Sequence, residues 1–136
     1  MPNWCENNVI IATELNEEDI RDKILNKYGK ITKEWDNNIL WEFDYDKVIP
    51  QPDNIKEALN NKDDSWYDWR IENWGVKWNA ADEAIEISLD DGWIFFSYYT
   101  PWSEPKHIID KLREDDNIEH ITWKYDDPSM EYTGYA

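Results

Sequence analysis

The sequence predicts an α+β fold, in which an antiparallel sheet carries helices on one face and a helical insertion follows the second strand. Apolar and acidic residues alternate over 39–48 and over 84–90, which is typical of strands with one buried face. Apolar residues recur every four positions from Ile20 to Tyr28, which indicates an amphipathic helix. An Asp-Gly pair at 91–92 predicts a tight hairpin. Helices mixed with hairpins favour antiparallel pairing with the helices on one side.

The first half of the chain supplies a strand, a helix and a second strand. A β-branched run at 9–12 predicts the first strand, and a helix follows over 16–28, with Asn16 as its cap and Gly29 as its stop. The second strand, 39–48, would bury one set of alternating side chains and expose the other. The buried set is Trp41, Phe43 and Tyr45, and the exposed set is Glu42, Asp44 and Asp46.

Two short helices form the predicted insertion, at 53–61 and 63–73. The first would turn Ile55, Ala58 and Leu59 inward, and the second would clamp itself to the sheet through Trp66 and Trp69.

The second half predicts a hairpin, a helix and a last strand. Strand 84–90 turns at 91–92 into strand 93–100, which is apolar on both sides and is expected to be packed on both faces. Ser103 would cap the next helix, with Pro105 in its first turn. Strand 118–126, a turn at 127–129 and an edge strand at 131–135 end the chain. The simplest plan with this order is ferredoxin-like, βαββαβ, as a single domain over 1–136.

Composition restricts the function. The 136 residues carry 31 acids and 14 bases, for a net charge of −17, and the acids are spread along the whole chain. Such a surface repels nucleic acid and anionic membranes and favours basic partners or cations, although solubility alone would also explain it. The single cysteine, Cys5, cannot form an internal disulfide, and no signal peptide or membrane span is evident. We therefore expect a cytoplasmic protein.

Four stretches resemble a known family. They are MPNWCENN at the start, ENWGVKW at 72–78, YYTPWSEP at 98–105, and the late Tyr125 with Tyr132-Thr133-Gly134. They are similar to the motifs of the YubB-type ferredoxin-like family of phages, plasmids and mobile islands, with Val76, Pro101 and Tyr132 as departures. The resemblance implies a fold and a mobile-element origin but no mechanism. We expect the motif residues to have a structural role. They are Trp4, Cys5, Asn73, Trp74, Gly75, Lys77, Trp78 and Trp102.

No catalytic machinery stands out, and the sequence predicts a binding protein rather than an enzyme. The two histidines, His107 and His120, lie on different elements without a zinc motif, and neither a P-loop nor an EF-hand loop is present. We expect no cofactor and no metal. Six of the ten tryptophans lie between Ser65 and Trp102, where core packing explains most of them and a ligand platform is the alternative.

The acids offer a candidate surface. Glu42, Asp44 and Asp46 would project from one strand face about 6.7 Å apart, and Glu86, Asp90 and Asp91 would add charge from the hairpin. A regular row of negative charge resembles a phosphate backbone. The first hypothesis is therefore a mobile-element protein that occupies a basic groove of a host protein, such as a defence nuclease or CRISPR effector. A carbohydrate or small-ligand module that uses Trp and carboxylate, and a structural homodimer, are the alternatives.

Overall fold

The computed structural model describes residues 4–36, 38–61, 63–127 and 132–136. Seven strands form one sheet in the order β2-β3-β4-β5-β1-β6-β7, and every neighbouring pair is antiparallel. This confirms the α+β class and the antiparallel sheet. The strands are β1 (Trp4–Ala12), β2 (Gly29–Trp35), β3 (Asn38–Phe43), β4 (Ile85–Asp90), β5 (Trp93–Pro101), β6 (His120–Asp127) and β7 (Tyr132–Tyr135).

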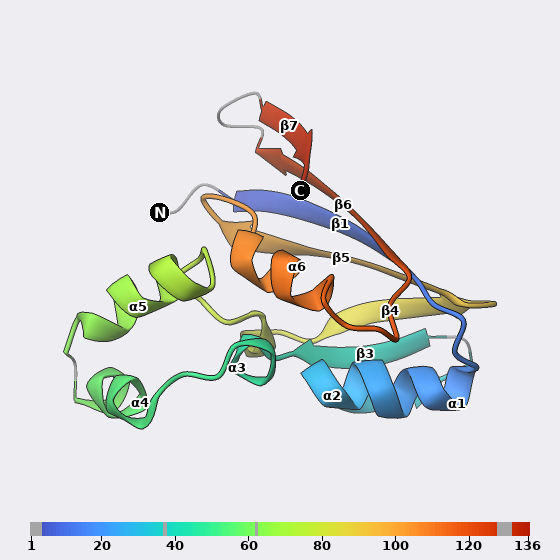
Figure 1. Cartoon of the computed structure of the whole chain (residues 1–136), viewed down its shortest axis with the longest axis horizontal. Coiled ribbons are helices and arrows are strands. Elements are labelled where there is room, and N and C mark those ends of the chain that lie inside the picture. The colour runs from blue at the N-terminus through green and yellow to red at the C-terminus, as the bar shows by residue number, and fades with distance from the viewer. Residues whose placement is uncertain (1–3, 37, 62, 128–131) are drawn as a thin grey trace.

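Helices cover one face of this sheet (Figure 1). The first helix is continuous through α1 (Glu17–Ile20), the π-turn η1 (Arg21–Leu25) and α2 (Asn26–Tyr28), and Asn16 caps it as predicted by accepting the Asp19 N–H at 2.8 Å. Figure 1 shows α2, α3 and α6 on the same side of the sheet, with α4 and α5 beyond its end. The later helices are α3 (Tyr45–Val48), α4 (Asp53–Asn60), α5 (Ser65–Asn73), the short 3-10 turn η2 (Ala80–Asp82) and α6 (Lys106–Leu112).

Aromatic side chains fill the space between the sheet and the helices. Trp41, Phe43 and Tyr45 are buried, and the first two rings stack at 4.7 Å between centroids. Trp41 also donates its indole N–H to the Leu25 carbonyl at 2.7 Å, which fixes the first helix to β3. The alternation of 39–45 therefore predicted the buried side correctly, and large rings supply much of the apolar burial.

Asn7 is the polar centre of the core. Its side chain is fully buried on β1, where its Oδ1 accepts the Trp123 indole N–H at 2.9 Å and its Nδ2 donates to Thr100 Oγ1 at 2.9 Å. Thr100 in turn donates to the Ser103 carbonyl at 2.6 Å. One side chain thus joins three adjacent strands and the turn that leads into α6. Among the described residues, no buried side-chain nitrogen or oxygen atom lacks a hydrogen-bond partner.

The strand predicted over 39–48 is wrong in its second half. β3 ends at Phe43, and Asp44 begins α3 by accepting the Asp46 N–H at 3.0 Å. Burial still alternates from Phe43 to Tyr45 across this boundary, so the pattern conceals the change from strand to helix.

The prediction that strand 93–100 is packed on both faces is also wrong. Side chains of β5 alternate between exposed and buried from Trp93 to Thr100. Ile94, Phe96 and Tyr98 enter the core, whereas Trp93, Phe95 and Tyr99 are exposed on the face that the helices leave open. The strand is central in the sheet, but only one of its faces is covered.

Other differences are local. β2 was missed. Gly29 ends the first helix as predicted, and it also starts β2, where a Cβ would lie 2.1 Å from the Glu42 carbonyl oxygen. Leu59 is exposed rather than inward. Ser103 does not cap α6, which begins at Lys106 after Pro105. Of the turn predicted at 127–129, residues 128 and 129 lie outside the described residues, as does residue 131 of the last strand.

The Asn7 network predicts a large stability difference between neighbouring positions. Asn7→Ala should lower the free energy of unfolding by about 2–3 kcal/mol, because it strands the buried Trp123 and Thr100 groups. Asn8→Ala is the matched control, since Asn8 is half-buried on the opposite face and should cost less than about 1 kcal/mol. Urea denaturation followed by circular dichroism measures both. Equal losses at the two positions would contradict the role given to Asn7.

Candidate functional site

The open face of the sheet is the candidate binding surface. Trp93 is 46% exposed, Phe95 36% and Tyr99 62%, all on β5. On the neighbouring β1, Ile10 pairs with Phe95 and is half-buried. Scattered apolar residues on a protein surface are ordinary, but a contiguous exposed set marks an interaction site.

The sheet splits beside this surface. β5 pairs with β4 from Trp93 to Phe95, and in the continuous described stretch 63–127 its later residues have no partner on that edge. The first residues of β4, from Ile85 to Ile87, pair with β3 instead. Figure 1 shows the two strands meeting at their hairpin and separating toward the end of the sheet that carries α5. A hollow of about 760 Å³ opens in this gap, which lies within the usual size range of ligand pockets.

Aromatic rings form one wall of the hollow. Trp4 is 45% exposed and Trp78 37%, and their ring centroids lie 5.7 Å apart with a tilt of 41°. Tyr99 stands beside them and donates its hydroxyl to the Glu6 carboxylate at 3.2 Å. These rings come from β1, from the loop before η2 and from β5, so three distant segments build the wall.

Carboxylates supply the charge. Glu6, Asp82, Glu83 and Glu86 line the hollow, and none of the described residues that line it is a lysine, arginine or histidine. The five ion pairs found among the described residues involve none of these four acids. The hydrogen bond that the Tyr99 hydroxyl donates to Glu6 raises the pKa of that exposed tyrosine. The hollow is therefore a region of negative potential with aromatic walls.

The floor of the hollow is neutral and polar. The hydroxyls of Tyr45 and Tyr98 lie 2.6 Å apart, and burial raises the pKa of both tyrosines, so that they stay protonated. Asn79 fixes the floor to the wall, because its Oδ1 accepts the Tyr45 N–H at 2.9 Å and its Nδ2 donates to Asp44 at 2.8 Å.

The acids predicted as a partner site do not form one row. Asp44 caps α3, and Asp46 lies within α3, where it accepts the Gln51 N–H at 2.7 Å and pairs with Lys56 at 3.5 Å. The row is lost because the chain turns into a helix after Phe43. Glu42 remains on β3 opposite Lys30.

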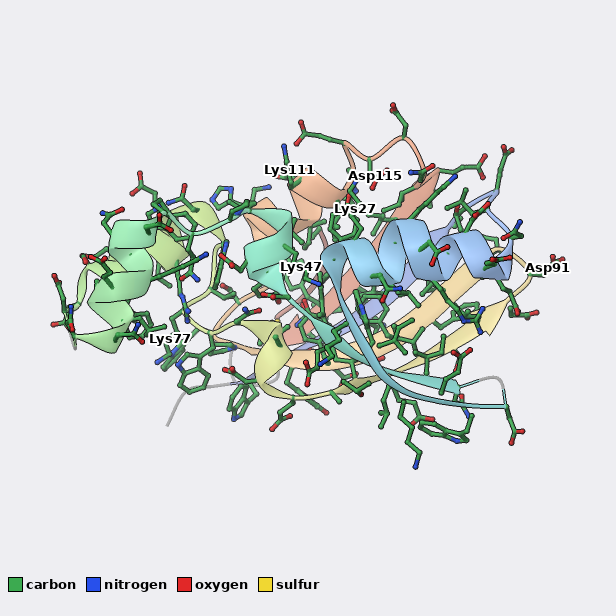
Figure 2. The ribbon with its side chains drawn as sticks, turned by 90° about the horizontal axis from the view of Figure 1, so that it is seen from below. Lys27, Lys47, Lys77, Asp91, Lys111 and Asp115 are labelled. Carbon is green, nitrogen blue, oxygen red and sulfur yellow. The ribbon has the colours of Figure 1, made fainter. Side chains whose placement is uncertain are left out.

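The hairpin acids are also divided. Glu86 lines the hollow, whereas Asp90 and Asp91 lie at the tip of the β4–β5 hairpin. Figure 2 shows Asp91 and Lys77, which neighbours Trp78, at opposite ends of the molecule. Of the six predicted acids, one therefore belongs to the hollow.

The family-motif residues divide into a buried set and an exposed set. Cys5 and Trp74 are fully buried, and Trp74 donates its indole N–H to the Ile49 carbonyl at 2.9 Å. Gly75 has a φ of +95°, and a Cβ there would lie 3.5 Å from the Pro105 carbonyl carbon, so this motif contacts the one at 98–105. Asn73 donates to the Trp69 carbonyl at 2.9 Å. These four residues are therefore packed or hydrogen-bonded within the fold.

The other motif residues differ from these four. Trp4, Trp78 and Trp102 are all exposed, and Lys77 holds its ammonium 4.7 Å from the centre of the Trp78 ring. Pro2 and Asn3 of the first motif lie outside the described residues. Sequence reasoning missed the wall of the hollow because it assigned these tryptophans to packing.

Arg70 was also missed, although it organises the loop beneath the hollow. It is buried, donates to Gln51 at 2.9 Å and to the Lys77 carbonyl at 3.1 Å, and stacks 4.8 Å from the Trp74 ring. Burial lowers the pKa of the guanidinium, with Asp82 and Asp46 opposing that effect. Its contacts hold the segment from Trp74 to Trp78 in place.

A second, smaller hollow of about 250 Å³ is less suited to binding. Three lysines line it, and Figure 2 shows them near one another with Asp115. Lys27 pairs with Asp115 at 3.1 Å, Lys47 donates to the Gly29 carbonyl at 2.7 Å, and Lys111 lies 3.7 Å from Glu114. Two of these ammonium groups lie within ion-pair distance of a carboxylate and the third donates to a backbone carbonyl, so each already has a hydrogen-bond or ion-pair partner.

In the described part of the chain, no group of three or more His, Cys, Asp or Glu side chains converges to hold a metal ion. None of the described helices is long and apolar enough to cross a membrane.

The two tryptophans of the 72–78 motif should differ in their effect on stability. Trp74→Ala should lower the free energy of unfolding by about 3–5 kcal/mol, because it empties a fully buried site. Trp78→Ala should cost about 1 kcal/mol or less, since its ring is partly in solvent. Urea denaturation of both variants tests this contrast. A loss at Trp78 as large as that at Trp74 would assign Trp78 to the core.

Comparison with known proteins adds no relative: no family model, no curated protein and no solved structure matches this chain. The resemblance to the YubB-type family stays a prediction.

Proposed function

We propose that the protein has a ferredoxin-like core enlarged by an insertion. β1 and β4 are both antiparallel to β5, which lies between them, and the first helix follows β1. β5 and β6 are both antiparallel to β1, which lies between them, and α6 connects them. Two interleaved β-α-β units of this kind support the ferredoxin-like plan. The β2–β3 pair and the helices α3 to α5 then form the insertion.

We propose further that this protein acts by binding a basic surface of another protein. The observation that carries the proposal is the uncovered sheet face, with its exposed aromatics and a hollow whose charged lining is entirely acidic. Interfaces are enriched in aromatic anchors, and complementary charge speeds association. The overall charge of −17 acts in the same direction at long range.

The partner class comes from the charge and from the family resemblance. A mobile-element protein of this kind would occupy the basic groove of a host nucleic-acid enzyme, such as a defence nuclease or CRISPR effector, in competition with its nucleic acid. The negative surface replaces the phosphate backbone there, without direct binding of nucleic acid by this chain and without catalysis. Such a role places the protein in the bacterial host cytoplasm.

A homodimer is the second candidate function. Trp93 and Phe95 stack at 6.5 Å on the open face, next to the half-buried Ile10. A second copy seated on this patch would cover it. Mass measurement in solution decides between the two functions, because the partner-binding proposal expects the face to be free and a dimer expects it to be occupied.

Charge reversal tests the proposed function. Glu42→Lys, Glu86→Lys and Asp90→Lys together should abolish capture of basic partner proteins from host lysate, because all three lie on the open face. Asp22→Lys, Glu57→Lys and Asp110→Lys form the matched control, with the same change in net charge on exposed helical positions. The control should keep the partner, and capture by the wild type should weaken as salt is raised.

Loss of capture by both triple variants would show that only net charge matters. Retention by both would show that the open face is not the binding surface. Either result contradicts the proposal.

A further inference from the structure

We propose that the hollow between β4 and β5 receives an arginine or lysine side chain from an extended segment of the partner protein. The inference rests on the proposed function, and it names the contact by which a basic partner would be held. Three independent properties of the hollow support it: its charge, its aromatic wall and its unpaired strand edge.

The charge of the lining selects a cation. Asp82, Glu83 and Glu86 are exposed and form no ion pair among the described residues, and Glu6 stands across the hollow from them. An anion would meet only like charge here. A neutral ligand would supply no counter-charge, and the carboxylates would interact only with water. A basic side chain would supply the counter-charge that Glu83 and Glu86 lack among the described residues.

The aromatic wall is suited to the same ligand. Cations bind over the faces of tryptophan and tyrosine rings within about 6 Å of the centroid. Lys77 makes such a cation–π contact with Trp78, because its ammonium lies 4.7 Å from the ring centre. Trp4 and Tyr99 offer further exposed ring surface beside it. The hydroxyl of Tyr99 is held by Glu6, which orients that ring.

The open strand edge explains why the cation would come from a peptide. Beyond Phe95, β5 pairs with β1 on one side and has no strand partner on the other within residues 63–127. Extended segments bind such edges by adding a strand, and their side chains then enter neighbouring pockets. The hollow of about 760 Å³ has room for a side chain together with its backbone.

The test uses blocked pentapeptides of the form Thr-Val-X-Val-Thr, in which X is arginine, lysine or the neutral isostere citrulline. Titration into the full, nitrogen-15-labelled chain is followed by amide and indole N–H shifts. The arginine and lysine peptides should give saturable shifts at 78–86 and 97–100, and their affinity should fall as ionic strength rises from about 0.01 M to about 0.15 M. The citrulline peptide should give none.

Loss of the wall or of the acidic charge should weaken binding, whereas loss of the neighbouring positive charge should strengthen it. Trp78→Ala should weaken binding of the arginine peptide by about three- to 30-fold, and Glu83→Gln with Glu86→Gln should also weaken it. Lys77→Met should strengthen it by about two- to threefold, because it removes a competing positive charge. Trp35→Ala is the matched control, since Trp35 is equally exposed on β2 but does not line the hollow. Trp78→Phe replaces Trp78→Ala if the latter fails to fold.

The outcomes separate this inference from the proposed function. Equal binding of the citrulline peptide, absence of saturable shifts, or shifts produced instead by neutral sugars such as maltotriose would overturn the peptide site. If the charge-reversal triple still loses its partner in that case, the proposed function stands without the hollow. If both triples keep the partner while the arginine peptide saturates at the hollow, the site stands and the proposed function fails.

Discussion

The hydrogen bonds of Asn7 are the constraint on which the structure depends. A fully buried amide is costly unless its donors and acceptor are used, and here they bind Trp123 on one side and Thr100 on the other. The same bonds fix the register of β1 relative to both of its neighbouring strands. Thr100 in turn donates a hydrogen bond to the Ser103 carbonyl in the turn before α6. A shift of β1 by one residue would put Asn7 on the open face and break all of these contacts. The register of the three central strands, and hence the gap beside β5, follows from one residue.

The hollow follows from that register and from the loop on the other side of the gap. β5 continues along β1 to Pro101, while β4 leaves it after three pairs to follow β3. Arg70 and Asn79 fix the intervening loop by bonds to the Lys77 carbonyl and to the Tyr45 N–H. The exposed rings of Trp4 and Trp78 are therefore supported by buried polar contacts behind them. A binding site needs such support, because its geometry must persist without the ligand.

Much of the fold could be predicted from the sequence, and the failures share a physical cause. Periodicity identified the helix after Asn16, the β4–β5 hairpin at 91–92 and the buried side of β3 correctly, since each depends on local spacing. It could not identify β2, because the KITKEW side chains of this strand are mostly exposed and show no buried face. The strand forms by pairing with β3. It also read β5 as packed on both faces, because an apolar side chain in a sequence does not reveal whether a helix covers it. The tryptophans that line the hollow were assigned to the core for the same reason.

The distribution of the acids explains why net charge alone was a poor guide to the site. Asp44 and Asp46 hold α3 and the turn after it, and Asp115 accepts bonds from Tyr28, from the Asn117 N–H and from Lys27. Burial raises the pKa of Asp115, but these three bonds outweigh it and leave that pKa below its usual value. Such acids are partners within the fold and contribute little to an external field. Glu83 and Glu86 differ, because they stand in solvent at the rim of the hollow and form no ion pair with any residue that the structure describes. The protein is acidic throughout, but the proposed binding of a basic group depends on the place where carboxylates without an ion pair among the described residues stand beside exposed rings.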